Sequence, residues 1–248
     1  MNTIDTRTLL DHLTHEDAQV RYLAATELGI RRDPAAAAAL VGRLGDERDF
    51  AVRERLTWAT VQLIDTALPG VLALLKDENP FARRQAAHVL SKVGDPAFAP
   101  HLVDVIADEH PDVAIKAYRA AANTGAPEVV APLVARLADG DQLQRDALTV
   151  ALATLGASAV PALIDALSDP DAEVRAHAAD ALGHLGGPDA DPAADALARL
   201  STDADADVAL AAVSALGELG EVADAALRAV SDAKGPLSPL ADRLLAGR

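Results

Sequence analysis

A motif of about 31 residues recurs seven times along this chain of 248 residues. Its clearest copy, D-A-E-V-R-A-H-A-A-D-A-L-G-H-L-G, begins at Asp171. Residues equivalent to its valine follow one another at spacings of 32, 30, 31, 31, 30 and 34, and they are Val20, Val52, Ala82, Val113, Gln144, Val174 and Val208. A fixed period in this range indicates a stack of similar units, in which each unit contacts only its neighbours.

Each copy predicts two helices joined by a turn. Val174, Ala178 and Leu182 are spaced by four residues, which places them on one face of a first helix. An Asp or Asn, such as Asp171, stands three residues before the anchor in six of the seven copies, where it can cap that helix. A second helix follows, as in residues 157–168, and ends at an acidic residue. No segment alternates as a strand would, so we predict an all-α fold.

The two ends of the chain carry incomplete units. A lone second helix is predicted near Thr3–Leu13 and a lone first helix near Pro236–Ala246. Half-units of this kind cap a stack that ends in water. The one longer spacing is explained by a wider loop at Gly186–Asp191. Because no linker is visible, we expect residues 1–248 to form a single repeat domain.

The run D-x-x-V-R-x-x-A-A-x-A-L-G-x-L-G resembles the short HEAT-like repeat of the phycobilisome lyase type. Ankyrin and tetratricopeptide units have similar lengths, but their signatures are absent. The resemblance covers essentially the whole chain. It implies a right-handed α-α superhelix, an α-solenoid of about seven helical hairpins with terminal capping half-units, whose second helices line the concave side. The same repeat serves enzymes, chaperone-like proteins and scaffolds, so it specifies the fold more strongly than the function.

Charge and cysteine content exclude several classes of function. Lys and Arg number 22 against 38 Asp and Glu, and a net charge of −16 argues against nucleic acid as the main ligand. The absence of cysteine excludes disulfides, thiolate metal sites and a cysteine nucleophile. Asp outnumbers Glu 28 to 10 and Arg outnumbers Lys 18 to 4, which resembles the proteins of extreme halophiles. The alternative is an acidic surface that only keeps the protein dissolved.

The longest uncharged run does not predict a membrane span. It covers Ala147–Ile164, is interrupted by Gly156 and Pro161, and is shorter than the ~20 apolar residues of a typical span. We interpret it as two short buried helices. The N-terminal residues lack the apolar stretch of a signal peptide, so a cytoplasmic protein without membrane contact is expected.

An arginine directly follows the anchor in five copies, at Arg21, Arg53, Arg83, Arg145 and Arg175. Four of them stand six or seven residues after an acid that ends the preceding helix, and these acids are Asp46, Asp77, Asp139 and Asp169. The first copy offers His15 instead, and Ala114 and Ala209 interrupt the series. We predict a structural Arg–Asp ladder that bonds adjacent units, which the resemblance also implies. The alternative is a basic row that binds phosphates.

No motif indicates catalysis or metal binding. Deoxyhypusine hydroxylases, which have the same repeats, bind iron through four His-Glu dipeptides, and this chain has only His15-Glu16. The Asp203-Ala-Asp205-Ala-Asp207 run lacks the glycine and the final glutamate of a calcium loop. Nucleophile and phosphate-loop motifs are missing. We therefore expect no cofactor, no metal and no enzymatic activity.

The remaining candidate is a protein-binding groove along the second helices. Residues near the ends of these helices vary freely between copies, as a surface shaped for a partner would. The predicted partner-binding residues are Arg43, His101, Asp104, Arg136, Asp165, Arg199 and Arg228. The aromatic residues Tyr22, Trp58 and Tyr118 are interpreted as packing residues.

The predicted function is a non-catalytic scaffold that binds another protein. The alternative is a phycobilin-lyase-related cofactor-attachment protein or a chaperone-like protein. That alternative requires a pocket that holds an acid or base of perturbed pKa.

Overall fold

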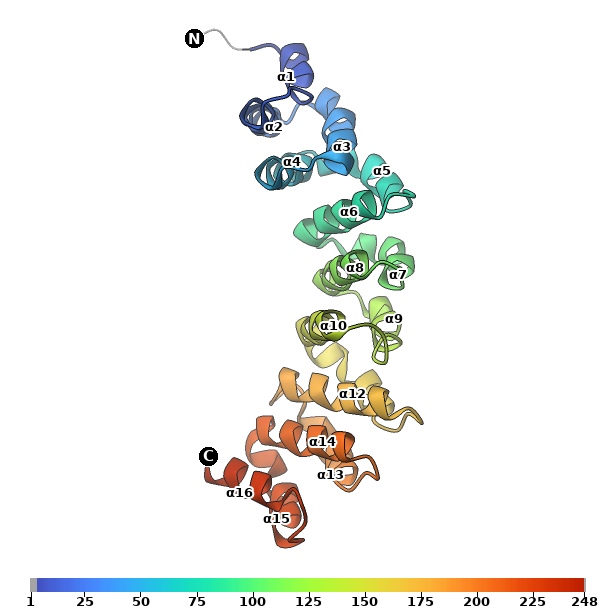
Figure 1. Cartoon of the computed structure of the whole chain (residues 1–248), viewed down its shortest axis with the longest axis vertical. Helices are drawn as coiled ribbons and strands as arrows, with labels where there is room; N and C mark the ends of the chain where they lie inside the picture. Colours follow the sequence, from blue (N-terminus) through green and yellow to red (C-terminus); the bar gives the residue numbers. More distant parts are fainter. Residues whose placement is uncertain (1–3, 248) are drawn as a thin grey trace. The chain divides into compact units, whose positions relative to one another are not determined.

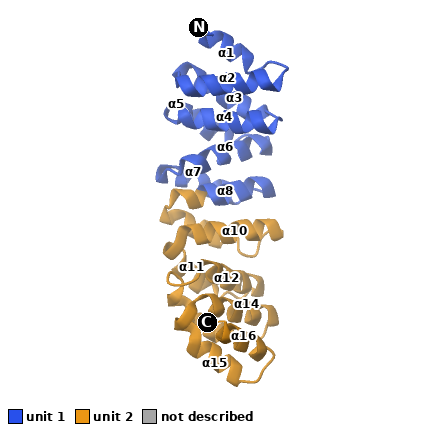
Figure 2. Cartoon of the chain, turned by 90° about the vertical axis from the view of Figure 1, so that its left-hand side faces the viewer, with its two compact units in different colours: residues 1–120 blue, residues 121–248 orange. Residues whose placement is uncertain are grey.

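The computed structural model describes residues 4–247, and within them the chain forms sixteen α-helices and no strand. First and second helices alternate in seven hairpins between two single helices, α1 (Thr6–His12) and α16 (Ser238–Ala246). The predicted all-α stack of helical hairpins is therefore confirmed, although Thr3, the expected start of the first helix, lies outside the described residues. The chain divides into two compact units, Met1–Ala120 and Ala121–Arg248 (Figure 2).

Unit 1 holds α1, the first three hairpins and most of the first helix of the fourth. Its first helices are α2 (Ala18–Arg31), α4 (Phe50–Gln62), α6 (Pro80–Val93) and the greater part of α8 (Pro111–Thr124). Its second helices after α1 are α3 (Ala37–Asp46), α5 (Ile64–Leu74) and α7 (Ala99–Ile106). Figure 1 shows α2, α4 and α6 as one layer and α3 and α5 as another. The hydrophobic core lies between these layers.

Leucines from both kinds of helix fill that core. Leu28, Leu56 and Leu90 of the first helices and Leu40 and Leu44 of α3 are fully buried. Complete burial of one such side chain contributes about 1.5–3 kcal/mol relative to exposure. The apolar residues that recur periodically in the sequence are thus the ones that each hairpin buries against the next.

Polar side chains begin most of the first helices as the sequence predicts. Asp17 accepts the backbone N–H of Gln19, and Asn79 accepts that of Phe81, which satisfies donors that a helix start leaves free. At the other end, Gly94 closes α6 with φ of 67°, a left-handed conformation that glycine adopts at little cost.

Unit 2 repeats the same pattern. Its first helices are α10 (Gln142–Leu155), α12 (Ala172–Leu185) and α14 (Ala206–Glu218). Its second helices are α9 (Val130–Val134), α11 (Val160–Ala166), α13 (Ala194–Leu200) and α15 (Asp224–Asp232). Six short 3-10 helices lie in the turns of the two units, at Pro34–Ala36, Pro96–Phe98, Pro127–Val129, Gly156–Ser158, Asp191–Ala193 and Gly220–Ala223.

Two glycines at the same repeat position allow first helices to approach closely. A Cβ atom on Gly183 of α12 would lie 2.9 Å from the Cα atom of Ala215 in α14. A Cβ atom on Gly29 of α2 would lie 2.5 Å from the Trp58 ring and 3.0 Å from the Cα atom of Ala59 in α4. A side chain at either position would push two helices apart.

Among residues 4–247, no single helix has both the length and the apolar composition of a membrane span. One pair, residues 142–158 and 160–166, reaches that length and composition together, but it is bent by 120° at the break. This bend separates the two helices that the sequence predicts within the uncharged run.

Candidate functional site

Three of the five predicted ladder arginines form two-pronged ion pairs. The Arg83 guanidinium donates to both carboxylate oxygens of Asp108, at 2.6 and 2.9 Å. Arg21 holds Glu47 in the same way at 2.8 and 3.0 Å, and Arg175 holds Asp203 at 3.0 Å on both oxygens. The paired acid stands at the end of the second helix of the same hairpin, 25 to 28 residues after the arginine.

Each of these arginines also binds the backbone just after the preceding second helix. Arg83 Nη1 donates to the backbone carbonyls of Asp77 and Glu78, at 2.9 and 3.1 Å. Arg175 Nη1 donates to those of Asp169 and Pro170 at 2.8 and 3.1 Å. One guanidinium therefore joins the ends of two successive second helices.

The carboxylate partners differ from the predicted acids. Asp77 and Asp169 contact their arginines through the backbone carbonyl, and each carboxylate accepts the N–H two residues later. Asp139 pairs instead with Arg136 at 2.8 Å. Asp46 is exposed, and the next residue, Glu47, takes the arginine. The physical reason is that the guanidinium fork points along its own hairpin, where the carboxylate of the following second helix lies.

Arg53 and Arg145 form no ion pair among the described residues. Arg53 lies 5.4 and 5.5 Å from the ring centres of Phe50 and Phe81, so it stacks on aromatic rings. Arg145 makes only 3.4 Å contacts with the carbonyl of Gly140 and the side chain of Gln142. The ladder is thus incomplete in both units.

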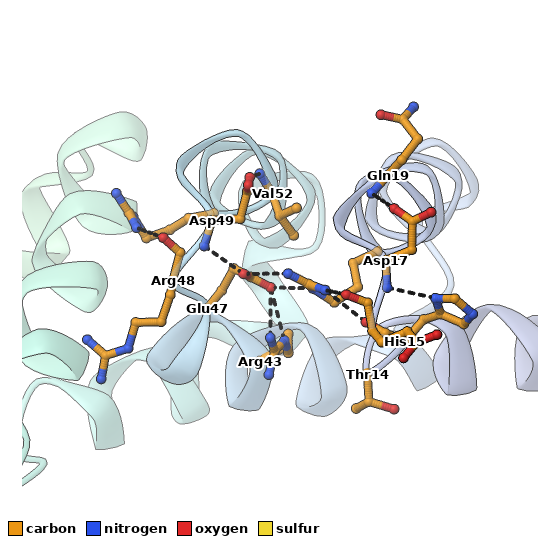
Figure 3. Close-up of polar contacts among 12 residues, drawn as sticks. Thr14, His15, Asp17, Gln19, Arg43, Glu47, Arg48, Asp49 and Val52 are labelled. Carbon is orange, nitrogen blue, oxygen red and sulfur yellow. Dashed lines mark hydrogen bonds and ion pairs between the residues drawn. The ribbon is translucent and has the colours of Figure 1, made fainter.

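Glu47 has the most strongly bound carboxylate of the ladder (Figure 3). Its side chain is 1% exposed, and it accepts from Arg21, from Arg43 and from the backbone N–H of Asp49. Burial opposes ionisation, but the hydrogen bonds of Arg21, Asp49 and Arg43 outweigh it and lower the pKa of Glu47 to about 2. Both charges of each of the three ion pairs are thus compensated within the fold.

The seven predicted partner-binding residues lie on or just after second helices, distributed over both units. Arg43 pairs with Glu47, just after the end of α3, and Arg228 pairs with Asp224 on α15. Arg136 pairs with Asp139 in the turn after α9. The other four, His101, Asp104, Asp165 and Arg199, are exposed. Arg199 lines a small cavity of about 200 Å³ in unit 2.

The exposed face of the first helices carries a feature that the sequence interpretation missed. Large apolar side chains stand in water there in pairs seven residues apart, Leu23 with Ile30 on α2 and Leu143 with Val150 on α10. A spacing of two helical turns places each pair on one side of its helix. These residues do not belong to the buried apolar series that recurs every four residues from each anchor. Large apolar residues outside that series are the signal in the sequence that could have revealed this surface.

Unit 2 has a groove of about 700 Å³ on this face. Its lining residues come from α10, α12 and the start of α14, and those with charged, polar or large apolar side chains are Gln142, Arg145, Asp146, Thr149, Val150, Glu173, His177, Asp180, His184, Asp205 and Asp207. Carboxylates outnumber the single arginine, so the groove favours cationic or polar ligand groups.

His177 is held firmly in the wall of this groove. Its Nδ1 lies 2.8 Å from the carbonyl of Leu137, and its Nε2 lies 2.9 Å from the hydroxyl of Thr149. Because a carbonyl only accepts, Nδ1 donates, and Nε2 of the neutral ring accepts from Thr149. Nearby, desolvation raises the pKa of the Asp180 carboxyl.

Residues 4–247 contain no cluster of three or more His, Cys, Asp or Glu side chains that could hold a metal ion. The acids of the calcium-like run have other roles. Asp203 pairs with Arg175, and Asp205 accepts the N–H groups of Asp207 and Val208 at the start of α14.

Unit 1 holds an aromatic cluster on the first-helix face. Tyr118 is buried as a packing residue, but Tyr22 and Trp58 are only half-buried. The Arg55 guanidinium lies 4.7 Å from the Tyr22 ring centre and 5.2 Å from the Trp58 ring centre, and it donates to the Tyr22 hydroxyl. With Ala51 and Glu54, these residues line a cavity of about 360 Å³.

Comparison with known proteins places the fold. A family model described as HEAT repeats matches residues 6–61, 62–122, 130–217 and 160–237. A chain of the Kap95p–RanGDP complex is 13% identical in sequence, with a TM-score of 0.60. The match covers 90% of this chain and 36% of the chain from the complex. This likeness extends to the fold alone.

Two other solved structures cover nearly the whole chain at lower structural similarity. Human deoxyhypusine hydroxylase is 21% identical with a TM-score of 0.43, covering 97% of this chain and 94% of its own. The complex of CpcE and CpcF of phycocyanin lyase from Nostoc sp. PCC7120 is 20% identical with a TM-score of 0.36, covering 100% and 96%. No curated protein matches this chain in sequence.

Proposed function

This chain belongs to the HEAT-repeat family, and we propose that it is a non-catalytic scaffold that binds another protein on the exposed face of its first helices. The observation that carries the proposal is the apolar surface of that face. Six of the eight large apolar side chains exposed within residues 4–247 belong to first helices, and these are Leu23, Ile30, Phe50, Leu143, Val150 and Leu210.

Exposed apolar side chains in pairs favour a protein partner over a small ligand. Single apolar residues on a surface need no explanation, but a row that flanks a groove is typical of interaction sites. Val150 lines the unit 2 groove, and Leu143 stands two turns earlier on the same helix. The proposal moves the predicted partner surface from the second helices to the first, because Arg43, Arg136 and Arg228 already use their charges in local ion pairs.

The chain offers a matched pair of valines for the test. Val150 on α10 is 56% exposed, and Val222, in the turn before α15, is 50% exposed. We expect affinity capture from an extract of the source cells, followed by mass spectrometry, to recover a protein that Val150→Ser loses and Val222→Ser retains. Equal recovery by both variants would contradict a partner surface on α10.

The alternative function, lyase-related cofactor attachment or a chaperone-like role, is favoured by one observation. Asp180 in the unit 2 groove has a raised pKa, and a general acid needs this property. A tetrapyrrole that binds there would shift its visible absorption on addition of the protein, and Asp180→Asn would change that shift. An unchanged spectrum at saturating protein would leave the scaffold as the remaining proposal.

A further inference from the structure

A group of cationic side chains in unit 1 lies on one part of the first-helix face. Residues 1–120 contain 14 Lys and Arg against 18 Asp and Glu, whereas residues 121–248 contain 8 against 20. Five of the unit 1 cations lie on α4, α6 and α8, and of these Lys92 and Arg119 are exposed while Arg55, Arg84 and Lys116 are half-buried. We call this set the basic strip, and it consists of Arg55, Arg84, Lys92, Lys116 and Arg119.

Helical spacing brings the members of the basic strip onto one face. Arg84, His88 and Lys92 are four residues apart on α6, and Lys116 and Arg119 are three apart on α8. His88 joins α6 to α4, because its Nε2 lies 3.2 Å from a carboxylate oxygen of Glu54.

The strip cations are not neutralised by ion pairs among the described residues. Arg84, Lys92, Lys116 and Arg119 form no ion pair within residues 4–247, in contrast to the paired ladder arginines. Burial lowers the pKa of the Lys116 ammonium, the nearby cations Arg84, Arg119 and Lys92 lower it further, and Glu54 opposes this shift. A bound anion would relieve this repulsion.

A cavity lined in part by aromatic rings adjoins the strip. The cavity of about 360 Å³ between Tyr22 and Trp58 opens beside Arg55, and Leu23 and Ile30 are exposed on the neighbouring α2. A ligand that spans the three strip helices must be about 20 Å long, since packed helices lie 8–10 Å apart. Roughly six extended residues of a polypeptide cover that distance.

We propose that the basic strip binds an acidic segment of a partner polypeptide, whose carboxylates face α6 and α8 and whose apolar side chain enters the Tyr22–Trp58 cavity. The inference rests on the proposed function insofar as the partner is a protein held on the first-helix face. A nucleic acid is the less favoured occupant. A long polyanion would extend beyond the strip and be repelled by the rest of the chain, whose net charge is −16. A short acidic segment would contact the strip alone.

The test uses the purified full chain and a fluorescein-labelled peptide of about twelve residues, in which glutamates alternate with leucines. Trp58 is the only tryptophan of the protein, so its emission reports directly on the cavity. At low salt we expect saturable anisotropy together with a shift of the Trp58 emission. A peptide with glutamine in place of glutamate should bind at least about tenfold more weakly.

Two charge-reversal pairs separate the strip from overall charge. Lys92→Glu with Arg119→Glu changes two exposed strip residues, and Arg7→Glu with Lys76→Glu makes the same change of net charge on exposed residues elsewhere in unit 1. We expect the first pair to weaken peptide binding at least about tenfold and the second less than about twofold. Circular dichroism confirms that both variants remain helical.

Three results would overturn the inference. These are equal weakening by both pairs, no binding of the peptide to the unaltered protein, or tighter binding of a single-stranded DNA of similar length, which would assign the strip to nucleic acid. Because the probe is synthetic and the strip lies in unit 1, this outcome is independent of the Val150 capture experiment in unit 2.

Discussion

At the scale of single residues, Glu47 shows how the charge of a buried carboxylate is compensated by its neighbours. Its two oxygens receive donors from Arg21, Arg43 and the backbone of Asp49, so the charge is compensated from three directions. The sequence predicts that an acid at this turn pairs with an arginine, but the spacing indicates Asp46 and not Glu47. Two adjacent acids, Asp46 and Glu47, cannot be distinguished by periodicity alone, because the choice depends on which side chain reaches the guanidinium.

The depressed pKa of Glu47 gives a pH prediction. A folded-state pKa of about 2 against an ordinary value of 4.5 means that the stabilisation is complete above pH 4.5 and is lost as pH falls toward 2. After allowance for solvent screening this is worth roughly 1–3 kcal/mol. We expect Glu47→Gln to lower the urea-unfolding free energy at pH 7 and to reduce the loss between pH 7 and pH 3.

The exposed neighbour supplies the control for that measurement. Asp46→Asn removes one negative charge from the same turn without touching Arg21. It should leave both the stability at pH 7 and its pH dependence nearly unchanged. A wild-type-like pH profile for Glu47→Gln would refute the assignment.

At the scale of helices, the ladder arginines connect successive hairpins, and the hydrogen bonds and ion pairs that they form differ along the chain. Arg83 and Arg145 occupy equivalent repeat positions, yet only Arg83 has a carboxylate partner. The sequence predicts both arginines, since each follows its anchor. It does not reveal that Arg145 remains unpaired, because that depends on side-chain reach across a turn.

This difference predicts unequal effects of the same substitution. Arg83→Ala leaves the nearly buried Asp108 carboxylate without its partner and should cost about 2–3 kcal/mol. Arg145→Ala removes only long contacts and should cost less than about 1 kcal/mol. Thermal melting measures both, and equal losses would show that the ladder does not stabilise the hairpins.

Helix contact distances give a second prediction at this scale. Gly183→Ala would place a methyl group 2.9 Å from the backbone of Ala215, so we expect the melting temperature to fall. Gly42 lies on the exposed side of α3 with no atom within 4 Å of an added Cβ. Gly42→Ala should raise stability by about 0.5–1 kcal/mol through helix propensity. Stabilisation by both changes would mean that α12 and α14 do not meet closely.

At the scale of the whole molecule, the repeat period predicts the fold because every hairpin obeys the same local rules. Capping acids, the four-residue apolar spacing and closing glycines all indicate the same helices that the structure contains. The candidate binding surfaces were less predictable. Leu143, Val150 and the basic strip lie outside the repeated pattern, and their significance depends on which helix sides remain uncovered. The single-domain interpretation of residues 1–248 stays a prediction.

The uneven charge of the two units predicts an uneven response to salt. Residues 121–248 carry 20 acids against 8 bases, so their self-repulsion exceeds that of residues 1–120, with 18 against 14. Raising KCl from about 0.1 M to about 2 M shortens the screening length from about 10 Å to below 3 Å. We expect hydrogen exchange to slow in both units and more strongly in residues 121–248. A flat salt profile would contradict halophilic adaptation.

Because one guanidinium joins two hairpins, only certain insertions and deletions in the chain keep its contacts intact. Arg83 takes backbone carbonyls from the hairpin before it and a carboxylate from its own. Duplication or deletion of one full repeat period therefore keeps every hydrogen-bond donor of the ladder together with its acceptor. A break elsewhere in the period would leave Asp108 or Glu47 as a desolvated charge with no counterion. Viable length variants of this protein should differ by whole hairpins.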